Sequence, residues 1–245
     1  MTAGPVIFNI DGHIARIVLN SPETGNRIDG SMAGELLEIC EQIYQDNGIY
    51  VVIIRAVGQS FCLGSVNPEE VYPVAEKVAL IEQPVIAAIK GNAVGQGLEI
   101  ALACEIRMAV DTAGFGMTQV AGGYLPRDGG TQRLSRIVGK ARALEMIWTG
   151  ETINAVEALK IGLVHRVVSA GGLDEEVDKM AGVMVTRAPL AMRYAKEAVL
   201  KGLDLTLEQG LRLEADLYYL LHTTADRTEG IEAFRQKRKP EFRGK

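Results

Sequence analysis

The 245-residue sequence lacks the features of a secreted, metal-binding or membrane-spanning protein. Its three cysteines, Cys40, Cys62 and Cys104, form no CxxC spacing, and their odd number fits reduced thiols. The three histidines form no HxxxH pair. No apolar run reaches the roughly 18 residues of a membrane span, and the N-terminus does not resemble a signal peptide. We therefore expect a cytoplasmic protein with no metal and no membrane partner.

The chain also lacks an excess of positive charge. Its formal net charge is −5, whereas a general nucleic-acid binder needs a basic surface. We therefore expect no nucleic-acid partner. The hydrophobic content of 47% is ordinary for a globular protein and supplies a sizeable core.

Short apolar runs in the first half predict strands. Asp11-Gly12 separates two β-rich runs and predicts a hairpin. Continuous β-branched runs further on are typical of strands buried on both faces. Strands alternating with helical spacing predict an α/β fold with a largely parallel sheet. The predicted strands cover 5–9, 13–19, 50–57, 85–89 and 106–110, and a helix covers 30–46.

Beyond residue 128 the pattern becomes mainly helical. One β-like run, 163–168, interrupts it. The predicted helices cover 139–149, 153–160, 174–186, 188–201 and 204–220. The sequence therefore predicts an α/β core followed by a helical C-terminal region.

The glycine-rich turn at 95–97 does not match the common nucleotide-binding or hydrolase motifs. A dinucleotide fingerprint would need a third glycine at position 100, which is Ile100. GxSxG and the Walker lysine pattern are also absent. Instead, 52–65 and 85–97 each lead a buried strand into a glycine-bearing turn. Two such turns can aim two backbone N–H groups at one oxygen, as in an oxyanion hole, or they are ordinary βα loops.

A single carboxylate, Glu99, lies in the apolar stretch 94-VGQGLEIALACEI-106. It must either reach solvent or perform chemistry in a sheltered pocket. A sheltered carboxylate has a raised pKa, which suits it for proton transfer near neutral pH.

Several long stretches together resemble the crotonase superfamily, also called the enoyl-CoA hydratase/isomerase family. They are 85-VIAAIKGNAVGQGLEIALACEIRMA-109, 115-FGMTQVAGGYLPRDGGTQRLSRIVG-139, 141-ARALEMIWTGETINAVEALKIGLVHRVV-168 and the tail 228-TEGIEAFRQKRKPEF-242. The resemblance covers essentially the whole chain. It implies a ββα-spiral core over 1–190 that binds acyl-CoA and a helical region over 191–245 that forms a homotrimer or a dimer of trimers. Coenzyme A enters as part of a thioester substrate, with no separate cofactor.

The resemblance also implies roles for residues in the two turns and the following helix. Ser65 and Gln96 supply the two oxyanion N–H groups, and Glu99 is the first catalytic glutamate. Gln96 replaces the glycine that is usual in the family, and Val66 replaces a frequent aspartate. The neighbouring residues predicted to contact the substrate are Leu63, Gly64, Val66 and Gly95.

The second catalytic position departs from the family pattern. Family hydratases carry a glutamate where this chain has Gln119, and an amide cannot act as an acid or base near neutral pH. Asp128, in 126-PRDGG-130, is an alternative acid or else the N-terminal cap of the helix that follows it. Its neighbour Arg127 would then pair with Asp128 or with an acidic acyl group.

Two further regions are predicted to bind substrate. The segment 66–83, which covers the acyl pocket in relatives, is short, and this favours a changed acyl group such as a cyclic or branched one. Phe234 and Lys237 lie in the basic tail, where relatives bind the adenine and phosphates of coenzyme A. The alternative for these two residues is a solvated helix end.

These residues predict a hydro-lyase that adds water to, or removes it from, an unusual enoyl- or dienoyl-CoA. The retained Glu99 favours this reaction. Gln119 favours a different outcome of the same enolate chemistry, namely isomerisation, decarboxylation, or hydrolysis of a ring or thioester. A non-catalytic member that only binds acyl-CoA is the third possibility.

Overall fold

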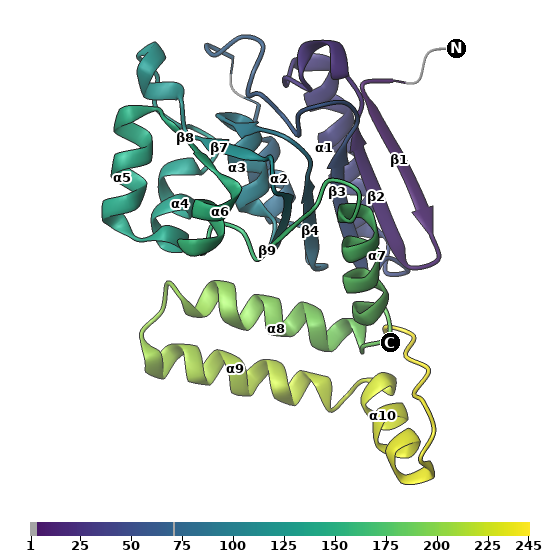
Figure 1. Ribbon diagram of the computed structural model, residues 1–245. Coiled ribbons are helices and arrows are strands. Elements are labelled where there is room, and N and C mark those ends of the chain that lie inside the picture. Colours follow the sequence, from purple (N-terminus) through teal and green to yellow (C-terminus); the bar gives the residue numbers. More distant parts are fainter. Residues whose placement is uncertain (1–3, 71) are drawn as a thin grey trace.

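A six-stranded sheet forms the centre of the protein (Figure 1). The computed structural model describes residues 4–70 and 72–245. The strand order is β1-β2-β3-β4-β6-β9, with an antiparallel β1–β2 hairpin and parallel pairing elsewhere. The strands are β1 (Val6–Asp11), β2 (Ile14–Leu19), β3 (Val51–Ala56), β4 (Val85–Ile89), β6 (Ile106–Val110) and β9 (Arg166–Val168). The predicted hairpin and parallel sheet are confirmed.

Helices cover the sheet and bury their apolar faces against it. Helix α1 begins after Asp29, whose carboxylate accepts a hydrogen bond of 2.8 Å from the Met32 N–H. All eight residues of α3 are buried, so this helix runs through the core rather than over it. The helices of the core are α1 (Gly30–Gln45), α2 (Val74–Ala79), α3 (Gln96–Ala103), α4 (Gly130–Val138), α5 (Lys140–Thr149), α6 (Ala155–Lys160) and α7 (Leu173–Met184).

A second, three-stranded sheet was not predicted from the sequence. Its order is β5-β7-β8, and its strands are β5 (Ala93–Val94), β7 (Gly114–Gly116) and β8 (Thr152–Asn154). Strands of two or three residues are too short for an alternating pattern to appear. This sheet nevertheless holds the turn before α3 in place, because the Gly95 N–H donates to the Gly116 carbonyl at 2.9 Å.

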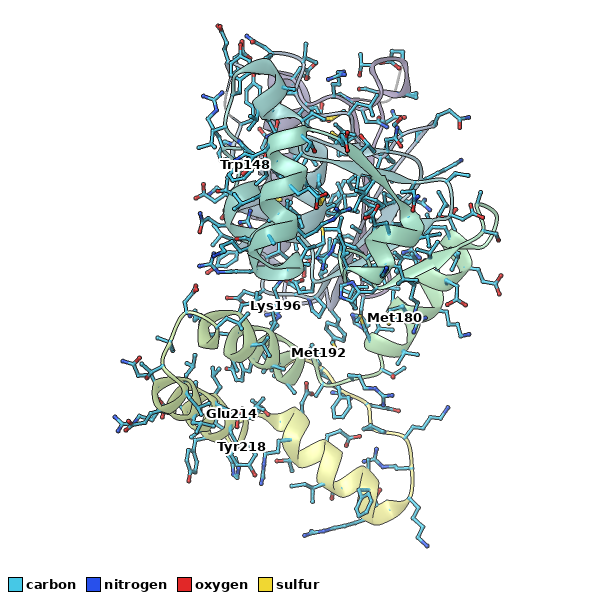
Figure 2. All side chains as sticks on the ribbon, turned by 60° about the vertical axis from the view of Figure 1, so that its left-hand side comes forward. Trp148, Met180, Met192, Lys196, Glu214 and Tyr218 are labelled. Carbon is cyan, nitrogen blue, oxygen red and sulfur yellow. The ribbon has the colours of Figure 1, made fainter. Side chains whose placement is uncertain are left out.

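The last helices form a separate layer. The antiparallel pair α8 (Pro189–Gly202) and α9 (Leu207–Leu221) lies beneath the core in Figure 1, and α10 (Ala225–Gln236) lies beside it. In Figure 2, Met192 and Lys196 lie on the core-facing side of α8, whereas Tyr218 lies on the far side of α9. The predicted helical C-terminal region is confirmed, and the predicted boundary at 190/191 falls inside α8.

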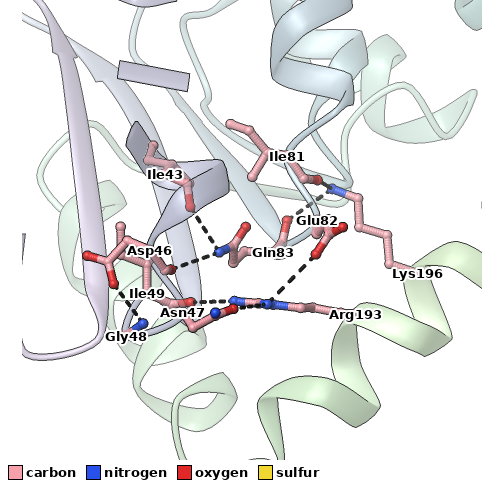
Figure 3. Close-up of polar contacts among 10 residues, drawn as sticks. All are labelled: Ile43, Asp46, Asn47, Gly48, Ile49, Ile81, Glu82, Gln83, Arg193 and Lys196. Carbon is pink, nitrogen blue, oxygen red and sulfur yellow. Dashed lines mark hydrogen bonds and ion pairs between the residues drawn. The ribbon is translucent and has the colours of Figure 1, made fainter. Parts of the chain in front are cut away.

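Two basic side chains attach α8 to the core (Figure 3). The Lys196 ammonium lies 2.9 Å from the Glu105 carboxylate and donates to the carbonyls of Ile81 and Gln83 at 2.6 and 3.0 Å. Arg193 donates to the Asn47 side chain at 2.8 Å. The Lys196 side chain is only 8% exposed, so these partners replace the hydration that its ammonium group has lost.

The predictions of no membrane span and of reduced cysteines can be compared with the structure. No helix in residues 4–70 and 72–245 is long and apolar enough to cross a membrane. Cys40, Cys62 and Cys104 are free and buried.

Replacing Lys196 with methionine should destabilise the protein by about 3 kcal/mol, since it leaves Glu105 without its buried cation. The free energy of unfolding in urea measures this loss. Lys201→Met removes an exposed pair with Glu197 on the same helix and should change little. If the two substitutions lowered the free energy of unfolding equally, Lys196 would not be the residue that attaches α8 to the core.

Candidate active site

Two glycine turns lie against each other at the mouth of a pocket of about 280 Å³. Gly64 and Gly95 have φ values of +96° and +56°, which other residues rarely adopt. The Val94 N–H donates to the Cys62 carbonyl at 2.9 Å and ties the turns together. In the described part of the chain, the N–H groups of Ser65 and Gln96 have no hydrogen-bond acceptor. Both residues line the pocket, as an oxyanion hole requires.

Glu99 lies on α3 at the base of this pocket and is only 2% exposed. Its Oε1 accepts hydrogen bonds from the N–H groups of Asp128 and Gly130, at 2.9 and 2.8 Å. Its Oε2 accepts from the Gln119 amide at 3.0 Å. Because Oε1 already has two donors, Oε2 is the oxygen that remains for an exchange of protons.

Burial raises the pKa of Glu99, because the ionised carboxylate has lost its hydration. The two backbone N–H groups favour the charged form and oppose this effect, as does the Arg133 guanidinium. The nearby Asp128 carboxylate raises the Glu99 pKa further. The balance gives Glu99 the raised pKa that suits a catalytic acid and base.

Gln119 begins the short 3-10 helix Gln119–Gly122 and faces Glu99. A carboxylate can only accept hydrogen bonds, so the Gln119 NH₂ group must point toward it. The Gln119 carbonyl oxygen is then left buried and without a partner among the described residues. It can accept a hydrogen bond from a bound molecule in the pocket.

Asp128 is buried, but it does not cap the helix that follows it. Gly129 occupies that cap position, and no side chain caps α4. The Asp128 carboxylate instead accepts hydrogen bonds from the N–H groups of Ala75 and Glu76, at 2.7 and 2.9 Å. The alternative that Asp128 caps the helix following it is therefore wrong. Asp128 instead caps α2, more than 50 residues earlier in the sequence. Burial raises the pKa of this carboxyl, while its hydrogen-bond donors oppose the shift.

The pocket contains most of the predicted site residues. They are Leu63, Gly64, Ser65, Val66, Gly95, Gln96, Glu99, Gln119, Arg127 and Asp128. Phe234 and Lys237 do not line it, because α10 lies in the separate helical layer (Figure 1). Their role at coenzyme A stays a prediction. The Arg127 guanidinium donates to the carbonyls of Pro68 and Glu69 rather than to Asp128.

Some site residues had no signal in the sequence. Arg27 follows the 3-10 helix Pro22–Thr24 and reaches the pocket, where it donates to the Ser65 carbonyl at 3.3 Å. Tyr124 and Leu125 add an apolar wall. The Gly130 N–H, which binds Glu99, had one signal in the sequence, the glycine pair of 126-PRDGG-130. A backbone that approaches another group closely often needs glycine.

Replacing Glu99 with glutamine should raise the melting temperature near neutral pH. The raised pKa of Glu99 means that its protonated form is favoured by folding. The stabilisation from protonated Glu99 is fully present below the pKa that Glu99 has in the unfolded chain. It is lost as the pH rises through the higher pKa that Glu99 has in the folded protein. The difference in melting temperature from wild type should therefore shrink toward acid pH, as thermal unfolding at several pH values will show. Glu38→Gln, at an exposed site on α1, controls for the loss of a charge. A difference in melting temperature that does not change with pH would contradict a raised pKa of Glu99.

Comparisons with known proteins give a consistent result. A family model described as "Enoyl-CoA hydratase/isomerase" matches residues 9–245. The chain is 38% identical to the (E)-benzylidenesuccinyl-CoA hydratase of Thauera aromatica, covering 98% of this chain and 99% of the relative. It is 34% identical to the crotonyl-CoA hydratase of Syntrophomonas wolfei, covering 97% of each. The crystal structure of an enoyl-CoA hydratase from Bacillus anthracis superposes with a TM-score of 0.94 at 36% identity, covering 98% of this chain and 100% of that one.

Proposed function

Since the chain belongs to the enoyl-CoA hydratase/isomerase family and has its crotonase-like fold, we propose that it adds water to the double bond of an enoyl-CoA thioester. The observation that carries this proposal is the pair Glu99 and Gln119 in the pocket lining: Glu99 Oε2 accepts from the Gln119 amide, and the Gln119 carbonyl oxygen has no partner among the described residues. A water molecule has two protons, and in this proposal it donates one to Glu99 Oε2 and the other to the Gln119 oxygen. The reverse reaction, loss of water, uses the same groups.

Glu99 performs both proton transfers in this proposal. Its Oε2 takes a proton from the water while the water oxygen bonds to the β carbon of the double bond. The electron pair of the double bond moves toward the thioester oxygen and forms an enolate. Glu99 then returns the proton to the α carbon, so the product contains one added water. No second acid is needed, and this fits an amide at position 119.

Gln119 orients the water. Its NH₂ group is held by Glu99, and its oxygen accepts the second proton of the water as a hydrogen bond. The lone pairs of the water oxygen are then free for attack on the β carbon. Positioning of this kind contributes to the rate without any change in protonation.

The N–H groups of Ser65 and Gln96 receive the charge that develops on the thioester oxygen. They belong to turns that are fixed by the sheet, so little reorganisation accompanies the reaction. One donor of this type typically contributes about 3 kcal/mol to lowering the barrier. Coenzyme A is bound as part of the substrate.

An unusual acyl group remains part of the proposal. The pocket wall is formed by a short segment around Val66 and Tyr72, together with Tyr124 and Leu125. The relative from Thauera aromatica is named for a benzylidenesuccinyl thioester, which is larger than crotonyl. A bulky or cyclic acyl group is therefore the substrate class to test first.

Isomerisation is the second candidate, and Gln119 is the observation that favours it. A single base can move a proton between the α and γ carbons without any added water. Glu99, at the position that the resemblance gives to the first catalytic glutamate, is the proposed base in this reaction as well.

Linear and cyclic enoyl-CoA thioesters in H₂¹⁸O distinguish these reactions by mass spectrometry. The proposal predicts a product heavier by one labelled water. The Glu99→Gln protein should form it at least about 10²-fold more slowly, because its proton transfer group is gone. A product of unchanged mass would assign isomerisation, loss of carbon dioxide would assign decarboxylation, and release of free coenzyme A would assign thioester hydrolysis. Tight binding without turnover would assign a binding protein.

The Gln119→Leu substitution should slow hydration by about 10-fold or more, since the water loses one of its two acceptors. Exchange of the α proton of a saturated acyl-CoA with deuterated solvent forms the enolate through Glu99 without added water, and it should fall less. Nuclear magnetic resonance of the thioester measures the exchange in parallel with turnover. Equal losses in both rates would contradict a role for Gln119 in holding water.

We also propose that the protein is a homotrimer or a dimer of trimers. The outer helices expose a large apolar surface, which is unusual for a monomer. Its members are Val199, Leu200, Leu203, Leu205, Leu207, Leu211, Tyr218, Tyr219 and Leu220. Light scattering should give three or six times the mass of one 26.5 kDa chain. The double substitution Leu207→Glu and Leu211→Glu should reduce that mass, and a wild-type monomer would overturn the proposal.

A further inference from the structure

The Gln96 side chain joins three separate segments around the pocket. It is 6% exposed. Its Oε1 accepts a hydrogen bond of 2.7 Å from the Ser65 hydroxyl. Its Nε2 donates to the Tyr72 carbonyl at 2.6 Å and to the Asp128 carboxylate at 3.1 Å. Because two acceptors face Nε2 and a hydroxyl can serve Oε1, this orientation of the amide satisfies every partner.

Asp128 extends the same set of contacts to α2. Its two oxygens accept from Ala75 and Glu76, the second and third residues of that helix. The residue before α2, Pro73, offers no side-chain cap. A helix of six residues is too short to be stable without such contacts. The first turn of α2 and the adjacent Tyr72 in the pocket wall therefore depend on a carboxylate from the loop 126–130.

The backbone of Asp128 contacts the catalytic carboxylate at the same time. Its N–H donates to Glu99 Oε1 at 2.9 Å. One residue thus touches Glu99 through its backbone, and α2 and Gln96 through its side chain. Through Gln96 it also reaches Ser65, whose N–H is one of the two oxyanion donors.

We propose that Asp128 and Gln96 are positioning residues: their side chains hold the two oxyanion turns and the first turn of α2 in one arrangement around the thioester. The inference deepens the proposed function, because a thioester oxygen is what the two N–H groups receive. Gln96 therefore acts twice, through its N–H toward the substrate and through its amide toward Ser65. Asp128 acts as an acceptor of three hydrogen bonds and transfers no proton.

Acetoacetyl-CoA provides a test that does not depend on hydration. When this thioester loses a proton to solvent, its enolate gives a near-ultraviolet absorption band, and an ordered oxyanion hole favours the enolate. Wild type, Asp128→Ala, Asp128→Asn, Gln96→Ala and the double alanine variant are compared with the ligand at saturation. Asn154→Ala is the matched control. It removes the cap of α6, where Asn154 accepts from Glu157 at 2.9 Å away from the pocket.

Each single alanine substitution should lower the enolate fraction by about 10-fold, and the double variant should fall no further than the more affected single variant, because both remove one network. Asp128→Asn keeps the shape of the side chain but turns an NH₂ group toward at least one former donor, and should show a smaller loss. Asn154→Ala should lower the melting temperature and leave the band unchanged.

Three results would overturn the inference: a wild type without an enolate band, an unchanged band in both single variants, or losses that multiply in the double variant. A wild type that shows the band but hydrates no enoyl-CoA would refute the proposed function alone and leave this inference standing.

Discussion

The site depends on the two backbone N–H groups that bind one oxygen of Glu99. A carboxylate that is 2% exposed is stable only when its lost hydration is replaced, and the Asp128 and Gly130 N–H groups replace much of it. All eight residues of α3 are buried, so the helix that carries Glu99 is enclosed by the core. The parallel strands fix α3, and α3 fixes Glu99. The loop 126–130 is held by α3 through Glu99 and by α2 through the Asp128 carboxylate.

The same contacts set the electrostatics of the pocket. Glu99 and Asp128 are two buried carboxylates joined through one backbone N–H, so the charge of one disfavours ionisation of the other. Arg133 reduces this repulsion, since its guanidinium donates to the Asp128 carbonyl at 2.8 Å and favours the charged form of both acids. Asp128 and Glu99 each accept three hydrogen bonds: those of Asp128 come from α2 and the Gln96 amide, and those of Glu99 come from the loop 126–130 and the Gln119 amide. The contacts of Asp128 with α2 support the positioning role proposed for it, and Glu99 transfers the proton in the proposed reaction.

The sequence alone predicted the parts that depend on local patterns. The β-branched runs gave β3 and β4 within one residue, and Asp11-Gly12 gave the hairpin. The resemblance predicted roles for Glu99 and the two turns, which the structure brings to one pocket. It could not reveal that Asp128 caps α2, because the partners are separated by more than 50 residues and no local spacing relates them. The small β5-β7-β8 sheet was also missed, since its strands are too short to produce a pattern.

Gln119 and Asp128 are best understood together. The resemblance implies a glutamate in family hydratases where this chain has Gln119, and a typically uncharged loop where it has Asp128. A glutamate at 119 would add a third carboxylate beside Glu99 and Asp128, and like charges this close in a buried site resist ionisation. The amide avoids that repulsion and still binds Glu99 at 3.0 Å. In the proposed reaction Asp128, the second buried acid beside Glu99, orders the pocket and transfers no proton. In the proposed reaction, proton transfer falls to Glu99 Oε2 alone, so the environment of that one oxygen decides the outcome.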